Sequence, residues 1–196
     1  PGAAAGAAGA AGGAGGAGEA SELTDPQRVA AGGAARVASA VAIFDFDQTL
    51  TTRHVGVFED PEGAGRAFGD ALRVQRLRAL LERLRGLGVA SVVVSRNSKH
   101  VVGKALQKVG LLSAMLCGDI YGFEDYADEV PKSAVVRGRI LPGLGLPATR
   151  AMFVDDDPGN IRDMSKRCPG ASVLKCSRTG LSQDECDQIA AWAEGV

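Results

Sequence analysis

Short apolar runs alternate with longer amphipathic segments along most of this chain. The runs are rich in Val, Ile and Phe and too short for helices, so they predict buried strands at 41–46, 89–94, 115–121, 150–154 and 172–175. Leucines, valines and other apolar residues recur at helical spacing between them, which predicts helices over 70–88, 98–109, 130–141, 157 onward and 182 onward. This alternation indicates an α/β fold with a parallel sheet covered by helices on both faces.

Local signals set several of these boundaries. Asp70 is placed to cap the helix that ends at Gly86 or Gly88, and Ser182 to Glu185 forms a capping box. The arginines of the first of these helices are interpreted as part of a solvated face. Residues 51–69, with four glycines and His54, predict a loop or flap beside the first strand, and His54 is either a solvated loop residue or a substrate contact.

The first part of the chain differs in composition from the rest. Residues 1–18 are only Pro, Gly and Ala, which offer little to bury and much backbone entropy to lose. We therefore expect a disordered tail over 1–38, with a short helix possible after Leu23, and one domain over 39–196. The start of the tail has neither the charged residues and apolar centre of a secretory signal nor the Arg and Ser of a typical transit peptide, since no arginine precedes Arg28.

Carboxylates follow two of the predicted strands. Asp45 and Asp47 come at the end of the first, and Asp155, Asp156 and Asp157 follow the fourth. The carboxyl ends of parallel strands share one edge of a sheet, where such folds bind ligands. Close carboxylates repel unless a cation relieves them, and oxygen ligands favour Mg²⁺. Asp157-Pro158 alone has a sufficient structural reason, as the start of a helix.

The decapeptide from Val41 to Leu50 resembles the first motif of the haloacid dehalogenase superfamily, Asp-x-Asp-x-Thr after an apolar strand. Asp45, Asp47 and Thr49 match it position for position. Ser95, after the second strand, matches the second motif, although an ordinary helix cap explains that serine equally well. Lys132 is assigned to the third motif, for which Lys99, Lys104 and Lys108 compete. Asp155 and Asp156 match the acidic fourth motif.

This resemblance implies a three-layer, Rossmann-like, doubly wound sheet with strand order 5-4-1-2-3. It implies an aspartyl-phosphate on Asp45, with Asp47 as general acid and base and with Ser95 and Lys132 stabilising the phosphoryl oxygens. Mg²⁺ is then held by Asp45, Asp47 through its carbonyl, and Asp156 with Asp155 beside it, although which of the last two is the direct ligand stays open. Substrate binding falls to Thr49, Arg96 and Asn97.

Neither interval between the motifs is long enough for a large cap domain. The chain is in this respect similar to the capless magnesium-dependent phosphatases. An open site suits a phosphorylated side chain on a protein or a small phosphate ester held loosely. We therefore expect broad, weak activity on small esters, with phosphoprotein or phosphotyrosine-like substrates as the leading natural class. The resemblance thus implies a Mg²⁺-dependent phosphatase acting on phosphate monoesters. A phosphotransferase or mutase and a non-catalytic binding module of the same fold are the alternatives.

The net charge and the cysteines indicate which partners and which cellular compartment to expect. A net charge of −1 gives no field for nucleic acid or a membrane surface, so we expect neither as a partner. Four cysteines without metal-site spacing predict reduced, mostly buried thiols and a cytoplasmic protein. The sequence leaves the natural substrate and the oligomeric state open.

Overall fold

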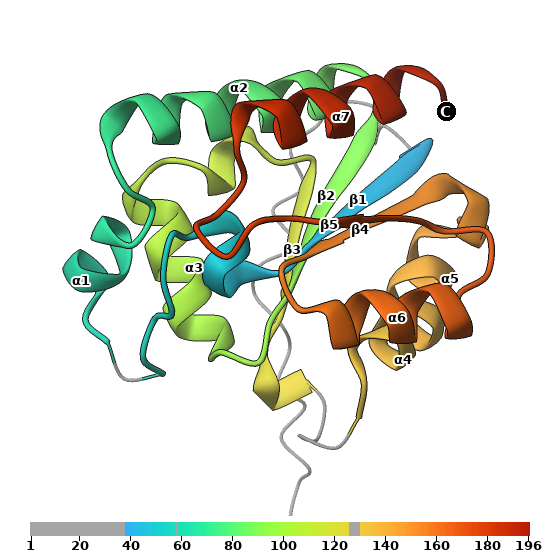
Figure 1. The fold of residues 1–196 in the computed structure, drawn as a ribbon, viewed down its shortest axis with the longest axis horizontal. Coiled ribbons are helices and arrows are strands. Elements are labelled where there is room, and N and C mark those ends of the chain that lie inside the picture. The colour runs from blue at the N-terminus through green and yellow to red at the C-terminus, as the bar shows by residue number, and fades with distance from the viewer. Residues whose placement is uncertain (1–37, 58, 126–129) are drawn as a thin grey trace, which may run out of the picture. The chain divides into compact units, whose positions relative to one another are not determined.

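The structure is a computed structural model that describes residues 38–57, 59–125 and 130–196. These residues contain one sheet of five parallel strands, namely β1 (Ala40–Phe44), β2 (Val89–Val94), β3 (Cys117–Tyr121), β4 (Ala151–Asp155) and β5 (Ser172–Lys175). Their order is β3-β2-β1-β4-β5, which confirms the predicted order read from the opposite edge (Figure 1). The predicted tail lies outside the described residues, apart from Ala38.

The central strand is buried on both faces. Ala40, Ala42 and Phe44 point into one core cluster, and Val41 and Ile43 into the other, because successive strand residues alternate. Two buried faces leave no position for a polar residue, which explains the uninterrupted apolar run in the sequence.

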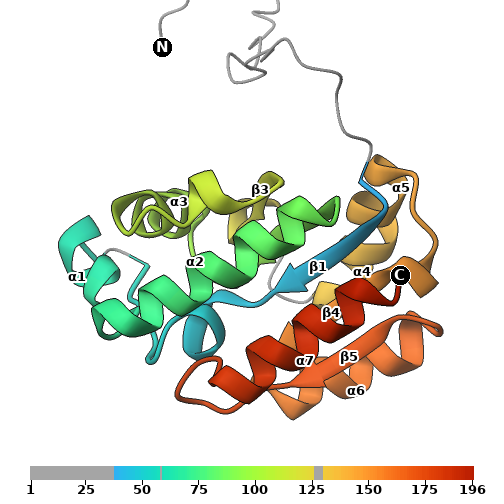
Figure 2. The ribbon, with the colours of Figure 1, turned by 90° about the horizontal axis from the view of Figure 1, so that it is seen from above.

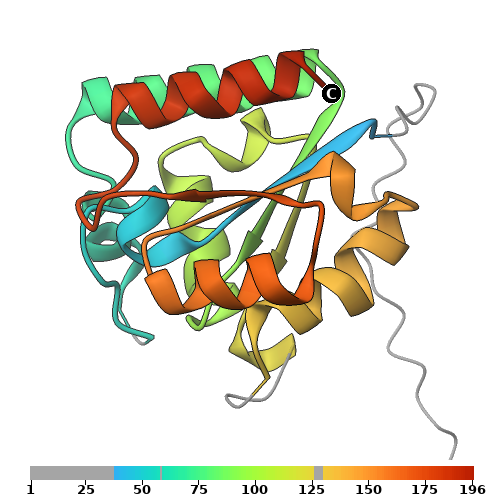
Figure 3. The same cartoon turned by 45° about the vertical axis from the view of Figure 1, so that its right-hand side comes forward.

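Helices cover the sheet in two layers. One layer holds α1 (Pro61–Arg66), α2 (Ala71–Gly86), α3 (Lys99–Lys108) and α7 (Gln183–Glu194). The other holds α4 (Lys132–Val135), α5 (Leu141–Leu144) and α6 (Pro158–Arg167). Figure 2 looks onto α2 and α7, and Figure 3 shows α7 (red) and α6 (orange) on opposite sides of the sheet. The arrangement confirms the predicted α/β layers, and no cap domain occurs among the described residues.

The expected loop over 51–69 is wrong in part, because it contains α1. The side chain of Asp60 accepts hydrogen bonds from the backbone N–H groups of Glu62 and Gly63, and Pro61 occupies the first turn. An aspartate followed by proline is a helix start, and the same pair at Asp157 was interpreted that way.

The helix expected over 130–141 begins at Lys132 and continues to Leu144. Its middle, Val136–Ile140, is a wider turn that precedes Pro142. Proline has no backbone N–H, so it cannot donate to the carbonyl one helical turn earlier. Gly145, with φ of 66°, ends the run in the left-handed conformation that favours glycine.

Cys168, Cys176 and Cys186 are buried free thiols, as predicted for most of the cysteines, whereas Cys117 is exposed. No helix in the described ranges has both the length and the apolar character needed to cross a membrane.

Candidate active site

Three carboxylates meet where β1 and β4 end. Asp45 directly follows β1, Asp155 is the last residue of β4, and Asp156 comes next. The two strands are parallel neighbours, with Phe44 beside Val154, so their ends reach the same edge of the sheet. One oxygen of each carboxylate lies within 4.8 Å of the others, and all three residues are buried.

Lys132, the first residue of α4, places its ammonium group between two of these acids. Its Nζ donates to Oδ1 of Asp45 and, at 2.8 Å, to Oδ2 of Asp155, and the side chain is only 4% exposed. The competing lysines lie on α3: Lys99 pairs with Asp125, Lys108 pairs with Glu62, and Lys104 is exposed. The lysine assigned from the sequence is therefore the one that contacts the acids.

The protonation of these groups follows from their burial and charge. Burial raises the pKa of Asp45 to about 7, although the ammonium of Lys132 opposes that rise. Burial alone would lower the pKa of Lys132, but Asp45 and Asp155 together outweigh it, so the pKa of Lys132 lies above its ordinary value. Burial also raises the pKa of Asp47, against hydrogen bonds from Val55 and Asn97. A cation beside Asp45 favours its ionised form.

The chain turns sharply after Asp45. Gln48 adopts a left-handed conformation with φ of 59°, and its N–H donates to Oγ1 of Thr51 at 3.1 Å. This turn directs the carboxylate of Asp47 toward Val55, whose N–H donates to Oδ1 at 2.6 Å. The apolar strand itself ends at Phe44, two residues earlier than predicted.

Three predicted site residues lie behind the acids. Thr49 Oγ1 donates to Asp45 Oδ2 at 3.3 Å, and Asn97 Nδ2 donates to Asp47 Oδ2 at 3.3 Å. Ser95 Oγ accepts from the N–H of Asn97 at 3.0 Å. All three are buried and none lines the cavity described next. The substrate contacts predicted for Thr49 and Asn97 stay a prediction.

The acids open into a cavity of about 230 Å³, which we call the acidic cavity. It brings together six predicted site residues, which are Asp45, Asp47, Arg96, Lys132, Asp155 and Asp156. It is also lined by Gln48, His54, Asp157, Asn160 and Arg178. Arg178 was missed. It lies three residues after β5, and the rule that strand ends share one edge, applied to the fifth strand, would have indicated it.

The two neighbouring aspartates of the fourth motif have different partners. Asp155 is fully buried and accepts from Lys132, from the N–H of Asp157 at 2.8 Å and from Asn160 Nδ2 at 3.0 Å. Asp156 faces Nε of Arg178 at 3.6 Å. Most of the hydrogen-bonding capacity of Asp155 is thus occupied inside the protein, whereas the partner of Asp156 lies at the surface.

The charges of this cluster fit a divalent cation. Three carboxylates carry three negative charges when ionised, and Lys132 neutralises one of them. The remainder equals the charge of one divalent ion, and carboxylate oxygens are the ligands that Mg²⁺ prefers. The residues present therefore suit the cofactor expected from the sequence.

Arg73 stabilises the turn after β1 through hydrogen bonds to its backbone carbonyls. Its Nη1 donates to the carbonyls of Leu50 and Phe68, both at 2.7 Å, and its Nη2 to the carbonyl of Thr49 at 3.3 Å. Arg73 is buried, so the expectation that this helix carries its arginines on a solvated face is wrong for this residue. The apolar pattern did not reveal it, because the partners are backbone carbonyls.

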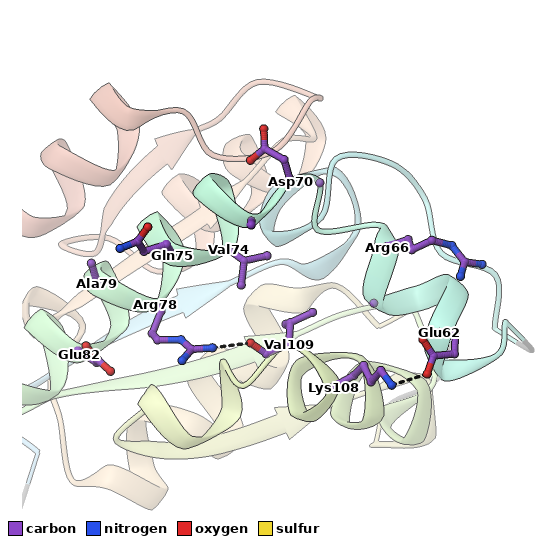
Figure 4. Close-up of a pocket in the computed structure, with 13 residues that line it drawn as sticks. Glu62, Arg66, Asp70, Val74, Gln75, Arg78, Ala79, Glu82, Lys108 and Val109 are labelled. Carbon is purple, nitrogen blue, oxygen red and sulfur yellow. Dashed lines mark hydrogen bonds and ion pairs between the residues drawn. The ribbon is translucent and has the colours of Figure 1, made fainter.

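A larger cavity of about 780 Å³ lies between α1, α2 and α3, and we call it the helical groove (Figure 4). Its charged lining residues are Glu62, Asp70, Glu82, Arg66, Arg78 and Lys108, three acidic and three basic. Lys108 pairs with Glu62, and Arg78 Nη2 donates to the carbonyl of Val109 at 2.9 Å. None of the residues that the structure describes lines both cavities.

No protein-family model and no curated protein matches this sequence. Solved structures do. The N-terminal part of the protein BF1531 from Bacteroides fragilis, described as containing a phosphatase domain and complexed with Mg, superposes with a TM-score of 0.57 at 16% identity. The match covers 80% of this chain but only 40% of that one, less than half of its length.

Two further structures match over most of their own length. The HAD domain of effector protein Lem4 from Legionella pneumophila gives a TM-score of 0.52 at 15% identity, covering 78% of this chain and 94% of that one. An uncharacterized protein from Corynebacterium glutamicum gives 0.53 at 18% identity, covering 79% and 95%. The order of the strands and these matches together show that the chain has the fold of the haloacid dehalogenase superfamily.

Proposed function

We propose that this protein is a phosphatase of the haloacid dehalogenase type that hydrolyses phosphate monoesters with Asp45 as nucleophile and Mg²⁺ as cofactor. The observation that carries the proposal is the contact of Lys132 with Asp45 and Asp155, in one cavity with Asp47 and Asp156. An acid held by a lysine beside a cation site suits attack on a phosphoryl group, because such transfer depends mainly on positioning and charge neutralisation. The Mg in the similar Bacteroides structure supports the choice of cofactor.

Asp45 and Asp156, with the backbone carbonyl of Asp47, would hold the cation. Asp155 lies beside them and keeps Lys132 in place. Asp156 is chosen over Asp155 because the oxygens of Asp155 are already engaged by Lys132, Asn160 and a backbone N–H. Bound Mg²⁺ supplies charge neutralisation of the phosphoryl oxygens.

The reaction has two steps. A carboxylate oxygen of Asp45 attacks phosphorus, the bond to the leaving alcohol oxygen breaks, and Asp47 gives that oxygen its proton. Asp47 then takes a proton from water, the water oxygen attacks phosphorus, and the bond between Asp45 and phosphorus breaks to release phosphate. Lys132 neutralises the carboxylate of Asp45 before the attack and stabilises negative charge on the phosphoryl oxygens in both steps.

Two of the three buried polar residues behind the acids act through them. Thr49 fixes the rotamer of Asp45, and Asn97 fixes that of Asp47. Ser95 holds the backbone of Asn97, and its predicted role as a donor to the phosphoryl group is part of the proposal. Precise placement matters because catalytic groups must be held close to the productive geometry.

Turnover of p-nitrophenyl phosphate tests this function. We expect Mg²⁺-dependent release of phosphate that EDTA abolishes and added Mg²⁺ restores. Borohydride added during turnover should convert Asp45 to homoserine, because it reduces an acyl phosphate. Turnover that survives EDTA would overturn the cofactor, and transfer of the phosphoryl group to an added alcohol without phosphate release would favour a phosphotransferase. Absence of turnover with an intact fold would favour the binding module.

A further inference from the structure

Basic side chains flank the acidic cavity on two sides. Arg96 follows β2 and Arg178 follows β5, and the order β3-β2-β1-β4-β5 places these two strands on opposite sides of β1, which ends at Asp45. Both arginines line the cavity, and so does His54. Lys132 lies deep among the acids, whereas Arg96, Arg178 and His54 are exposed.

The backbone that carries Arg178 is fixed to the turn after β1. The carbonyl of Arg178 accepts from Gln48 Nε2 at 3.2 Å. Gly180 N–H donates to the carbonyl of Gln48 at 3.1 Å, and Leu181 N–H to that of Thr49 at 2.9 Å. These hydrogen bonds fix the backbone of Arg178 relative to the segment that carries Asp45 and Asp47. The side chain of Arg178 itself is exposed.

The guanidinium group of Arg178 reaches over the cluster. Its Nε lies 3.6 Å from Oδ2 of Asp156, and the side chain is 66% exposed. Asp156 is one of the acids that fit a divalent cation, and a bound cation would share the negative charge of this carboxylate. The positive charge of Arg178, which lines the cavity, is then available to an anionic group that enters it.

The size of the cavity decides which part of a substrate reaches these arginines. About 230 Å³ accommodates a phosphoryl group and a few further atoms, less than the roughly 300 Å³ at which ordinary ligand pockets begin. The rest of the substrate must lie at the rim, between Arg96 and Arg178. Guanidinium groups bind carboxylates and phosphates through paired, charge-assisted hydrogen bonds.

Resting on the proposed function, we propose that Arg178, together with Arg96, binds a second anionic group of the substrate. The preferred substrates are then small phosphate monoesters that carry a carboxylate or a second phosphate within a few bonds of the scissile ester. This assigns a specificity role to Arg178 and selects a class within the phosphate monoesters.

A matched substrate pair tests this inference. 3-Phosphoglycerate and glycerol 3-phosphate differ only in a carboxylate against a hydroxymethyl group. We expect wild-type kcat/KM to favour 3-phosphoglycerate by about tenfold or more, since a charge-assisted hydrogen bond contributes about that much. Arg178→Gln should reduce the ratio toward one, and Arg178→Lys should retain part of it.

Arg85→Gln is the control for loss of one positive charge. Arg85 is exposed at the end of α2, donates to the carbonyl of Ser113 at 2.7 Å and does not line the acidic cavity. This variant should keep the wild-type ratio. An equal ratio in Arg178→Gln and Arg85→Gln would overturn the role of Arg178.

Binding of non-hydrolysable probes separates this inference from the proposed function. With Mg²⁺ present, 3-phosphonopropionate should bind the wild-type protein more tightly than propylphosphonate in calorimetry, and Arg178→Gln should remove the difference. Equal binding of the two phosphonates by the wild-type protein overturns the inference even where p-nitrophenyl phosphate is hydrolysed. Preferential binding without any hydrolysis keeps the anion site and overturns the phosphatase.

Discussion

The acidic cavity and the helical groove differ in size, in charge and in the elements that build them. The groove is more than three times larger, about 780 Å³ against 230 Å³. Its acids and bases are equal in number, and its ion pair lies at the surface. The smaller cavity holds converging buried carboxylates and a buried lysine. Volume therefore does not indicate the proposed active site, because catalysis depends on fixed charges that converge on one point.

The supporting structure explains this difference. Most side chains of the helical groove extend from the surfaces of helices. Their charged ends are positioned mainly by the rotamers that the side chains adopt. The acids of the cavity extend from strand ends, and backbone hydrogen bonds join the surrounding turns: Asp45 to Val154, Gly180 to Gln48 and Leu181 to Thr49. Strand ends in one sheet keep their relative positions, so they can hold repelling charges together.

Replacing the proposed nucleophile should give the largest difference in activity between variants of the two cavities. We expect Asp45→Asn to lower kcat for p-nitrophenyl phosphate by about ten-thousandfold or more, since the amide cannot attack phosphorus. Arg78→Ala in the helical groove should change kcat less than about twofold. Circular dichroism of both variants controls for folding. A large loss in Arg78→Ala with activity retained in Asp45→Asn would make the groove the active site.

Removal of the buried lysine tests the electrostatics of the cavity. Lys132→Ala leaves Asp45 and Asp155 buried without their shared cation, and should lower the free energy of unfolding by about 3–5 kcal/mol. Mg²⁺ should recover part of this loss, because it supplies positive charge at the same acids. Thermal denaturation with and without Mg²⁺ measures both effects. An unchanged melting temperature without Mg²⁺ would show that these acids are not ionised together.

Two neighbouring aspartates, Asp156 and Asp157, are expected to have different roles, the first as a metal ligand and the second as a helix cap. Asp156→Ala should weaken Mg²⁺ binding by about a hundredfold, or about 2.7 kcal/mol. Asp157 accepts from the N–H of Gly159 at the start of α6, so Asp157→Ala should cost mainly about 1 kcal/mol of stability. Mg²⁺ titration of the two variants by calorimetry compares them. The reverse ranking would assign the ligand to Asp157.

Most of the fold could be predicted from the sequence, because apolar runs and capping residues act locally. The five strands lie within a few residues of their predicted ranges, and Ser182 caps α7 as expected. The helix α1 was missed although Asp60-Pro61 carries the same signal as Asp157-Pro158. The difference is length: α1 has six residues, too few to show an apolar period.

The site was predictable where carboxylates follow a strand, and less so where contacts depend on distant turns. Asp45 and Asp155 approach because β1 and β4 pair, which the resemblance implied. Arg178 and Arg73 act through a turn more than twenty residues away in sequence. Neither residue belongs to a motif. The shared edge of the strand ends would have indicated Arg178, whereas Arg73 is revealed only by its contacts with the carbonyls of Thr49 and Leu50.

Substitutions at two glycines test whether the turn after β1 and the segment after β5 are held rigidly together. Gly180 has φ of 82°, and an added Cβ would lie 2.6 Å from the carbonyl oxygen of Thr51 and against Arg73. Gly180→Ala should therefore cost about 2 kcal/mol of stability and lower kcat, since the turn that carries Asp47 must move. Among the described residues, an added Cβ at Gly138 meets no atom within 4 Å beyond its own helix backbone and chain neighbours, so Gly138→Ala should stabilise the protein by about 0.5–1 kcal/mol. Urea denaturation would contradict the rigid pairing if both variants had the same stability.

The smallest effect is expected at the ion pair of the helical groove. Lys108 and Glu62 contact each other much as Lys132 contacts Asp45, but their side chains are 48% and 64% exposed, against 4% and 8% for the buried pair. Water already solvates the exposed charges, so Lys108→Ala should change the free energy of unfolding by no more than about 0.5 kcal/mol. Added salt should reduce even this change, because exposed pairs are screened. Urea denaturation at low and high salt measures it beside Lys132→Ala. If the two alanine variants were equally destabilised, burial would not distinguish the pairs, and the charges of the groove would be as firmly fixed as those of the acidic cavity.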